Sequence, residues 1–292
     1  MPSLRLATRS SAQATAQAQA VADALTAAHS DLMIELVFVE TLGDQRADVA
    51  LHTMGGQGVF VKEVQHAVLR GDADLAVHSA KDLPSAPAEG LTIAAFCKRR
   101  DARDALVGAA LDQLADGATV ATGSVRRRAQ LTAVRPDLRF VELRGNINTR
   151  LTKVPEGGAI VMAVAALQIL QLTERIAQHL SLSEFVPAPG QGCVAIECRS
   201  EDTTTAGLLA AVDHAATRWS VELERAFLAR LGSGCSLPVA AHATGNRLSA
   251  FLADPERNVH VARTIAIAGR PSDAIDQAGA LADELQQLLE RT

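Results

Sequence analysis

In the segment Asp74-Leu75-Ala76-Val77-His78-Ser79-Ala80-Lys81-Asp82-Leu83-Pro84, an apolar run passes directly into a lysine and an aspartate. Such a run is typical of a strand that is covered on both faces of its sheet. Lys81 and Asp82 would then emerge at the carboxyl end of the strand, where open α/β sheets bind ligands. Asp82 could exchange a proton or stabilise a developing cation, or the pair could be an ordinary surface ion pair. His78 could be a general base or a histidine packed near the core.

Similar apolar runs alternate with helical patterns on both sides of this segment. The predicted strands are 4–7, 34–39, 74–78, 91–96, 118–122, 138–143, 159–164 and 193–198, and the predicted helices are 12–28, 59–69, 126–134 and 167–179. This alternation indicates an α/β architecture with largely parallel sheets. After about residue 215 the predicted order becomes helix 215–231, strands 239–244, 248–253 and 259–268, and helix 272–290, which indicates a smaller α+β unit.

Two loops interrupt the α/β pattern, at residues 98–101 and at the Pro/Gly cluster of residues 187–192. Both have the composition of domain boundaries. If both are hinges, the middle of the chain is an inserted lobe. The predicted domains are therefore 1–98 with 192–214, then 99–191, then 215–292, the last carrying Cys235.

The composition bounds the class of protein. The 292 residues are 48% hydrophobic and carry a formal net charge of −5, which suits two or three globular domains and disfavours nucleic-acid binding through an overall basic field. We see neither a secretory signal nor an apolar run of the roughly 18–20 residues that a membrane span needs. The four cysteines form no C-x-x-C pattern, so a reducing cytoplasm without structural metal is the simplest expectation.

Arginines cluster at three predicted strand–helix junctions. Arg9 follows the first strand, ahead of Ser11 and the start of a helix. Thr122-Gly123-Ser124 is followed at once by Arg126, Arg127 and Arg128, and Arg144 and Arg150 flank another loop. Cations in a first helical turn oppose the helix dipole, which is easier to understand if an anion binds there. Each arginine alone could be a solvated surface charge, but together they indicate an anion cleft between two domains.

One cysteine lies in a small glycine loop, Gly232-Ser233-Gly234-Cys235-Ser236-Leu237-Pro238. The glycines permit a sharp turn and leave the thiol uncrowded, and Gly232 is placed to end the preceding helix. The thiol could simply be buried under a loop. Combined with the arginine clusters and the Lys–Asp pair, it suggests a polyanionic cofactor that is attached covalently.

Taken together, these segments resemble the porphobilinogen deaminase family over nearly the whole chain. The segments that carry the resemblance are Leu4-Arg5-Leu6-Ala7-Thr8-Arg9, the 74–84 segment quoted above, Arg103-Asp104-Ala105-Leu106-Val107, Thr122-Gly123-Ser124-Val125-Arg126-Arg127, Leu143-Arg144-Gly145-Asn146-Ile147-Asn148-Thr149-Arg150, Pro187-Ala188-Pro189-Gly190-Gln191-Gly192, Glu224-Arg225-Ala226 and Gly234-Cys235-Ser236-Leu237-Pro238-Val239. The resemblance implies three domains, two of them like the lobes of a periplasmic binding protein.

The resemblance also implies an activity, that of hydroxymethylbilane synthase. The family joins four porphobilinogen molecules head to tail, releasing ammonia each time, on a dipyrromethane cofactor linked as a thioether to Cys235. Asp82 would be the catalytic acid. The cofactor would be held by Lys81, Ser79, Thr122, Ser124, Arg126, Arg127, Arg150, Gln191 and Gly192, and the substrate by Arg9, Ser11, Arg144 and Arg150. A cytoplasmic monomer that needs no metal and binds neither nucleic acid nor membrane is implied.

The chain departs from the family pattern at Gln168-Ile169, where members commonly carry Lys-Arg. Isoleucine cannot bind a carboxylate, so either another cation compensates or substrate binding is weaker. Two alternatives therefore stay open: a repurposed member of the family, and a two-lobed anion-binding protein without catalysis, in which Cys235 and Asp82 have no necessary role.

Overall fold

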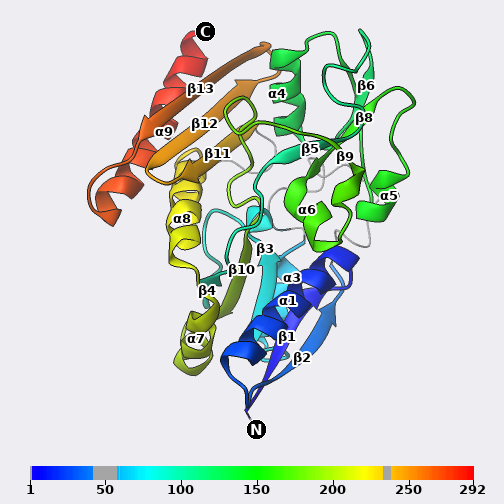
Figure 1. Ribbon diagram of the computed structural model, residues 1–292. Helices are drawn as coiled ribbons and strands as arrows, with labels where there is room; N and C mark the ends of the chain where they lie inside the picture. The colour runs from blue at the N-terminus through cyan, green and yellow to red at the C-terminus, as the bar shows by residue number, and fades with distance from the viewer. Residues whose placement is uncertain (1, 42–57, 59, 233–237) are drawn as a thin grey trace.

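The computed structural model describes residues 2–41, 58, 60–232 and 238–292. It contains two five-stranded sheets and one three-stranded sheet. Figure 1 shows two α/β lobes, one above the other, with the small C-terminal sheet and its helices beside the upper lobe. The predicted fold class, two α/β lobes with a smaller α+β domain, is confirmed.

The first lobe has the strand order β2-β1-β3-β10-β4. Its strands are β1 (Ser3–Arg9), β2 (Met33–Val39), β3 (Leu75–Ser79), β4 (Leu91–Phe96) and β10 (Val194–Arg199). Helix α1 (Ala12–Ala28) buries Val21 and Leu25 against one face of this sheet, in a cluster with Leu6. Helix α3 (Lys62–Leu69) packs Val64 and Val68 on the opposite face. Burial on both faces explains why the strands are continuous apolar runs.

The second lobe repeats this arrangement with the order β7-β6-β8-β5-β9. Its strands are β5 (Asp104–Gly108), β6 (Thr119–Ala121), β7 (Arg139–Val141), β8 (Ala159–Ala163) and β9 (Ile176–His179), and its helices are α4 (Val125–Val134), α5 (Ile147–Leu151) and α6 (Val164–Ile169), followed by the short turn η3 (Thr173–Arg175). In both lobes a parallel trio of strands is followed by the strand that arrives from the other lobe and then by an edge strand.

Four of the five strands in each lobe sheet run in the same direction, as expected for largely parallel sheets, and one strand in each runs against the others. Strand β10 runs antiparallel to β3 and β4, and β5 runs antiparallel to β8 and β9. The reason is the chain path, because β5 and β10 each enter their sheet directly from the other lobe and so approach from the opposite end. Short local patterns do not reveal the direction from which a strand enters.

The prediction of a helix over residues 167–179 is wrong. Helix α6 ends at Ile169, and Gln171 adopts a left-handed conformation with φ 56°, which an α-helix cannot contain. The chain then continues as η3 and the edge strand β9. Strand β9 alternates between partly buried and exposed residues, but four residues are too few for this period to stand out in the sequence.

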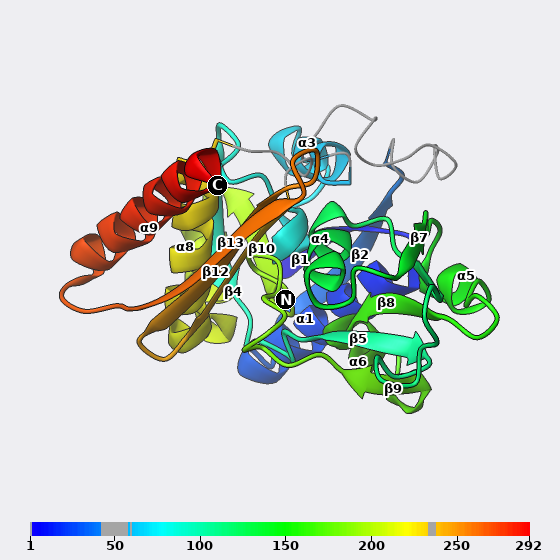
Figure 2. The ribbon, with the colours of Figure 1, turned by 90° about the horizontal axis from the view of Figure 1, so that it is seen from above.

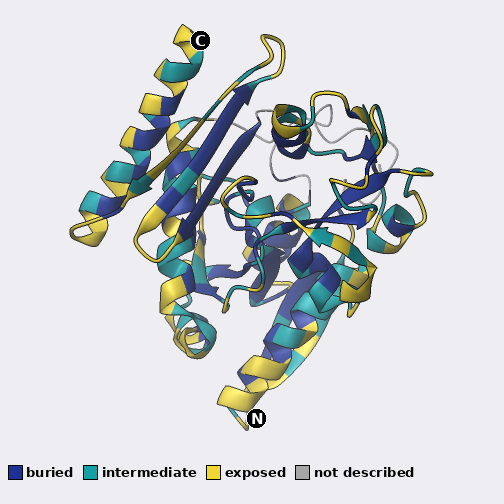
Figure 3. Cartoon of the chain, turned by 45° about the horizontal axis from the view of Figure 1, so that its top comes forward, coloured by how far each residue is buried: buried dark blue, intermediate teal, exposed yellow. Residues whose placement is uncertain are grey.

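The C-terminal unit is an antiparallel sheet covered by two helices. Strands β11 (Val239–Thr244), β12 (Arg247–Asp254) and β13 (Val259–Ala266) pair in that order. Helices α8 (Ala215–Arg230) and α9 (Pro271–Arg291) bury Phe227 and Leu285 against one face. The other face meets the second lobe, where Phe251 packs with Val186. Figure 3 shows β11 and β12 as buried and β13 as a largely exposed edge.

Two connections join the lobes, one after β4 and one before β10, and they run side by side. The Arg100 N–H donates to the Gly192 carbonyl at 2.9 Å, and the Cys97 N–H donates to the Val194 carbonyl at 2.9 Å. In Figure 2 the C-terminal sheet and the second lobe lie on opposite sides of this central region. The domain limits given above stay a prediction. Within the described ranges, no helix is both long and apolar enough to cross a membrane.

Candidate active site and cofactor cleft

The carboxyl ends of β1 and β3 carry the predicted residues of the first lobe. Arg9 ends β1, and its guanidinium carbon lies 4.1 Å from the centre of the Phe60 ring, a cation–π distance. Ser11 caps α1, since its hydroxyl accepts the Ala14 N–H at 3.4 Å. A cavity of about 60 Å³ opens here, and its lining is Arg9, Ser11, Gln13, Ala14, Gln17, Phe60, Val61, Val77, His78, Ser79 and Asp82.

Asp82 reaches this cavity because the chain turns directly after β3. Strand β3 ends at Ser79, and a single 3-10 turn, η2 (Ala80–Asp82), follows. Ser79 is fixed by the amide of Gln17, whose Nε2 donates to the Ser79 hydroxyl at 3.1 Å. Lys81 and Asp82 are both partly exposed. The strand end therefore presents a cation and a carboxylate at the mouth of the lobe, as the sequence predicts.

In the second lobe, Arg126 and Arg127 converge on a buried carboxylate, that of Asp104. Arg126 lies 2.8 Å from Asp104 Oδ2, and Nη2 of Arg127 donates to Asp104 Oδ1 at 2.6 Å. The same two guanidinium groups also donate to the Val186 and Val161 carbonyls at 2.9 Å. Burial alone would raise the pKa of Asp104, but the two arginines lower it to about 2. Much of the hydrogen-bonding capacity of this pair is thus used inside the protein.

The two hydroxyls predicted beside these arginines form the start of α4. The Ser124 hydroxyl caps the helix by accepting the Arg127 N–H at 3.4 Å. Thr122 is buried, and its hydroxyl accepts the Ser124 N–H at 3.2 Å. Both side chains therefore fix the turn that aims Arg126 and Arg127.

Gln191 and Gly192 lie in the connection between the lobes. The Gln191 amide donates to the Ala102 carbonyl at 2.8 Å and to Asp104 Oδ1 at 3.0 Å. Gly192 has φ +83°, and a Cβ placed there would lie 2.9 Å from the Arg100 carbonyl oxygen. Both residues therefore lie where the two connections between the lobes touch each other.

Lys81 and Arg150 each interact electrostatically with charged side chains of the other lobe. Burial lowers the pKa of Lys81 to about 8; Asp82 opposes this shift, while Arg127 and Arg126 add to it. Burial likewise lowers the pKa of Arg150 to about 10, and repulsion from Arg127 and Arg144 contributes.

These interactions place Lys81 and Asp82 opposite the arginines of the second lobe. Arg150 also interacts with Asp82 across the lobes, although its Nε donates to the Gly145 carbonyl at 2.7 Å. Cations that repel one another in a partly dry cleft are stabilised by added anions. Among the described residues, Lys81 and Asp82 thus interact electrostatically with arginines of the second lobe, and the convergence of all the basic clusters on one cofactor site stays a prediction.

His78 is packed near the core, one of the two roles left open by the sequence. It is 5% exposed, and its Nε2 lies 3.1 Å from Oε2 of Glu197, which is 2% exposed. The same Glu197 oxygen accepts the Gln65 amide at 2.8 Å. The histidine nevertheless also lines the cavity beside Asp82.

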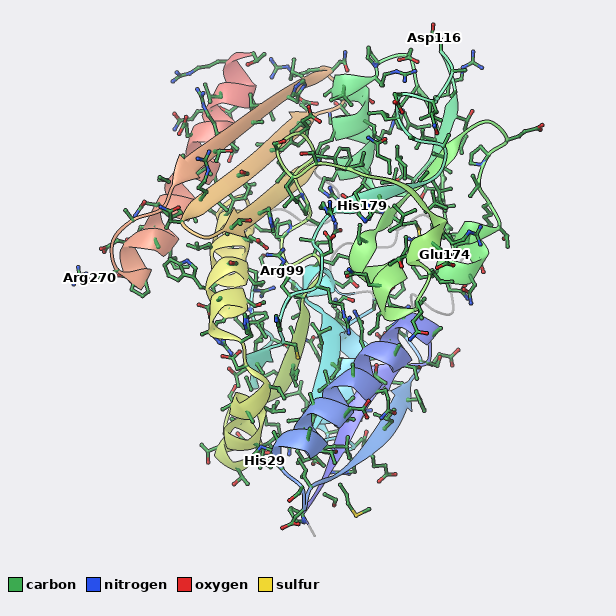
Figure 4. All side chains as sticks on the ribbon, viewed as in Figure 1. His29, Arg99, Asp116, Glu174, His179 and Arg270 are labelled. Atoms are coloured by element: carbon green, nitrogen blue, oxygen red, sulfur yellow. The ribbon has the colours of Figure 1, made fainter. Side chains whose placement is uncertain are left out.

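Besides Glu197, two further buried carboxylates were given no role by the sequence reasoning. Asp104 pairs the arginines of α4, and Glu224, which is 0% exposed, joins the C-terminal domain to both connecting strands. Glu224 accepts Arg99 Nη1 at 2.6 Å and the Gly190 N–H at 2.7 Å, and it also accepts the Ala243 N–H at 2.8 Å. Figure 4 labels Arg99 at the centre of the molecule. The only signal in the sequence was that both acids belong to segments resembling the family.

The predicted attachment residue, Cys235, lies outside the described residues. Gly232 ends the preceding helix as predicted: its φ is +61° and its N–H donates to the Ala229 carbonyl at 3.1 Å. Pro238 is described again just before β11. The role of Cys235 stays a prediction.

The fold and the site together define a class, that of two-lobed α/β proteins with cationic side chains that interact between the lobes. Residues 4–207 match the family described as porphobilinogen deaminase, dipyromethane cofactor binding domain, and residues 219–287 match porphobilinogen deaminase, C-terminal domain. The chain belongs to the porphobilinogen deaminase family, as its sequence segments predicted.

Individual relatives agree with this assignment. The chain is 45% identical to a porphobilinogen deaminase of Acidothermus cellulolyticus, over 97% of this chain and 88% of the relative. It is 48% identical to that of Xanthomonas axonopodis pv. citri, over 86% of this chain and 84% of the relative. Among solved structures, the methionine binding protein MetQ matches with a TM-score of 0.45 and 14% identity, over 72% of this chain and 88% of MetQ, which is too distant to support an argument about function.

Proposed function

We propose that this member of the porphobilinogen deaminase family joins four porphobilinogen molecules head to tail, with loss of ammonia, on a dipyrromethane primer bound through a thioether to Cys235. The product, hydroxymethylbilane, serves tetrapyrrole biosynthesis. The observation that carries the proposal is the match of residues 4–207 to the family's cofactor-binding domain, a range that contains the Asp82 carboxylate at the cavity and the arginines of the second lobe.

The residues present fit the cofactor. Each pyrrole ring bears an acetate and a propionate, so a bound dipyrromethane carries four carboxylates. Burial and repulsion by neighbouring cations lower the pKa values of Lys81 and Arg150, and carboxylates bound beside them would favour their charged forms. We assign Lys81, Arg150 and the hydroxyls of Ser79, Thr122 and Ser124 to these carboxylates. When bound, the dipyrromethane supplies the pyrrole carbon to which the first substrate is joined.

Arg126 and Arg127 have a more indirect role in this proposal. Asp104 already provides them with a carboxylate, and two backbone carbonyls take further N–H groups. Only their remaining N–H groups can reach a cofactor carboxylate. Asp104 and Gln191 therefore hold the guanidinium groups of Arg126 and Arg127 in place. Gly192 allows the two connections between the lobes to stay in close contact.

Substrate binding falls to the cavity at the ends of β1 and β3. Arg9 and Ser11 line this cavity, and Arg150 interacts electrostatically with both Asp82 and Arg144. An incoming porphobilinogen would place its two carboxylates on these arginines and its aminomethyl group near Asp82. Charge-assisted hydrogen bonds of this kind fix orientation as well as affinity.

Asp82 is the catalytic residue of the proposal. Loss of ammonia from porphobilinogen leaves positive charge on the pyrrole, and so does formation of the new carbon–carbon bond. A carboxylate held beside both events lowers their barriers electrostatically. It can also give a proton to the leaving amine and take it back. The 3-10 turn fixes this carboxylate at the cavity mouth.

We further propose that the protein is a cytoplasmic monomer that binds neither nucleic acid nor membrane. The net charge of −5 opposes binding to a polyanion through an overall field. The cysteines within the described ranges are free thiols, as in reducing compartments. Light scattering at several concentrations tests the oligomeric state.

The activity is tested by incubating the holoenzyme with porphobilinogen and measuring ammonia and linear tetrapyrrole together. We expect four ammonia molecules for each hydroxymethylbilane released. Saturable binding of porphobilinogen without release of ammonia would contradict the proposal and favour the anion-binding alternative.

A further inference from the structure

A buried histidine–glutamate pair lies directly beneath the substrate cavity. Glu197 on β10 is opposite Ala76 on β3, so it shares a sheet face with His78, two residues further along. The His78 Nε2 lies 3.1 Å from Glu197 Oε2, and both side chains are 3% exposed. Gln65 of α3 donates to the same oxygen at 2.8 Å. Side chains from three elements thus converge on one buried carboxylate.

This arrangement determines which ring nitrogen of His78 can accept a proton from the substrate. His78 Nε2 lies within ion-pair distance of Glu197 Oε2 but does not meet hydrogen-bond geometry, so the carboxylate acts on the ring through its charge and favours a hydrogen on Nε2. The nitrogen left for proton transfer is then Nδ1. A partner carboxylate of this kind fixes the tautomer of a histidine and stabilises its protonated form. The other charged groups around the pair are Arg9 and Asp82 at the cavity and Arg225, which interacts with Glu197.

His78 also has access to the substrate site. It lines the same cavity as Arg9, Ser11 and Asp82. The reaction needs a proton acceptor there, because a pyrrole carbon that has just formed a bond to the next unit must lose its hydrogen to become aromatic again. Asp82 is adjacent to the developing cation, and no second acceptor has been assigned.

We propose that His78, oriented by Glu197, accepts the proton from the α-carbon of the last-added porphobilinogen unit when the next unit is joined to it. The C–H bond breaks, its electron pair returns to the pyrrole ring, and the proton moves to His78 Nδ1. The imidazolium then passes this proton to the ammonia released in the same cycle, so ammonium leaves and His78 is regenerated. This inference rests on the proposed function.

The first test is His78→Gln, because a glutamine amide can still donate to Glu197 but cannot accept the proton. We expect kcat to fall about a hundredfold, the usual scale for one general base, with little change in KM. Porphobilinogen deuterated at its free α-carbon should then show a larger primary isotope effect on kcat than in the native enzyme. His66→Gln, at an exposed position of α3, is the matched control and should match the native enzyme.

The second test is Glu197→Gln, with kcat and the isotope effect of α-deuterated porphobilinogen measured in the holoenzyme. Removing the carboxylate charge should lower kcat at least about tenfold and enlarge the isotope effect, because the imidazolium loses its partner. This readout applies even if His78→Gln fails to retain its cofactor.

Native kcat and a native isotope effect in His78→Gln would overturn the assignment, as would an unchanged kcat and isotope effect in Glu197→Gln. A lower kcat without a larger isotope effect would also overturn it. In all these cases the native enzyme would still make hydroxymethylbilane. If the native holoenzyme releases no ammonia from porphobilinogen, the proposed function itself is wrong.

Discussion

Asp82 is a single carboxylate at the mouth of the cleft, and its charge is the property on which catalysis depends. Asp82→Asn keeps the size and much of the hydrogen bonding of the side chain. In protein made with preassembled cofactor, we expect porphobilinogen still to bind and turnover to fall at least about a hundredfold. Stopped-flow binding and steady-state turnover separate the two effects. Near-native turnover would mean that Asp82 is structural.

Lys81 gives the cleft a pH dependence. Its pKa is lowered to about 8, so its positive charge, and its attraction for carboxylates, is present below pH 8 and lost as the pH rises through this value. We expect the apparent KM for porphobilinogen to rise between pH 7 and pH 9. Lys81→Arg keeps its charge over this range and should flatten the rise. An equal rise in both proteins would show that another group titrates.

At the residue level, the sequence predicted which arginines belong to the site but not the buried partners with which they pair. Arg126 and Arg127 were expected to face an external anion, and the structure pairs them with Asp104, 23 positions from Arg127. A contact between residues so far apart in the chain leaves no local pattern. For the same reason His78 could be placed near the core, but its partner Glu197 could not be named.

At the scale of elements, Glu224 on α8 ties the C-terminal domain to the connections between the lobes. Glu224→Gln leaves the Arg99 guanidinium without its buried partner. We expect the free energy of unfolding to fall by about 3 kcal/mol, measured by urea denaturation. Glu222→Gln, which removes an exposed partner of Arg218 on the same helix, should cost less than about 1 kcal/mol. Equal losses in the two variants would contradict this role.

Helix α6 carries the departure from the family pattern. Ile169 is partly exposed there, and α6 contacts α1 across the lobes. We expect Ile169→Arg to fold normally and to lower the apparent KM for porphobilinogen, because it restores a cation near the cleft. The gain should shrink as salt rises. Ile169→Gln adds polarity without charge and should leave KM unchanged. If both variants lower KM equally, charge is not the cause.

Helices and strands were predicted correctly where the hydrophobic periodicity extended over many residues or where the element is largely buried. Helix α1 and strands β4 and β11 have the predicted bounds. It failed for β9, a short edge strand after a left-handed glutamine, and β5 was not predicted as a strand. Short strands contribute too few residues to show a period.

At the scale of the whole molecule, the path of the chain explains why the two α/β lobes were predicted correctly and why the antiparallel strand in each sheet was not predicted. Alternating strands and helices predicted two α/β lobes correctly. The two crossings that bring the lobes together also place one antiparallel strand at the heart of each sheet, and this follows from tertiary topology alone. The same crossings carry Gln191 and Arg99, so the cleft and its connections form one continuous structure.

The central claim is that this chain holds its own primer on Cys235, and intact mass measures this most directly. Protein expressed in a host that makes porphobilinogen should be heavier than its sequence by one dipyrromethane. Cys235→Ser should be folded, inactive and unmodified. An adduct that persists in Cys235→Ser, or that peptide mapping places on Cys97, Cys193 or Cys198, would contradict the account.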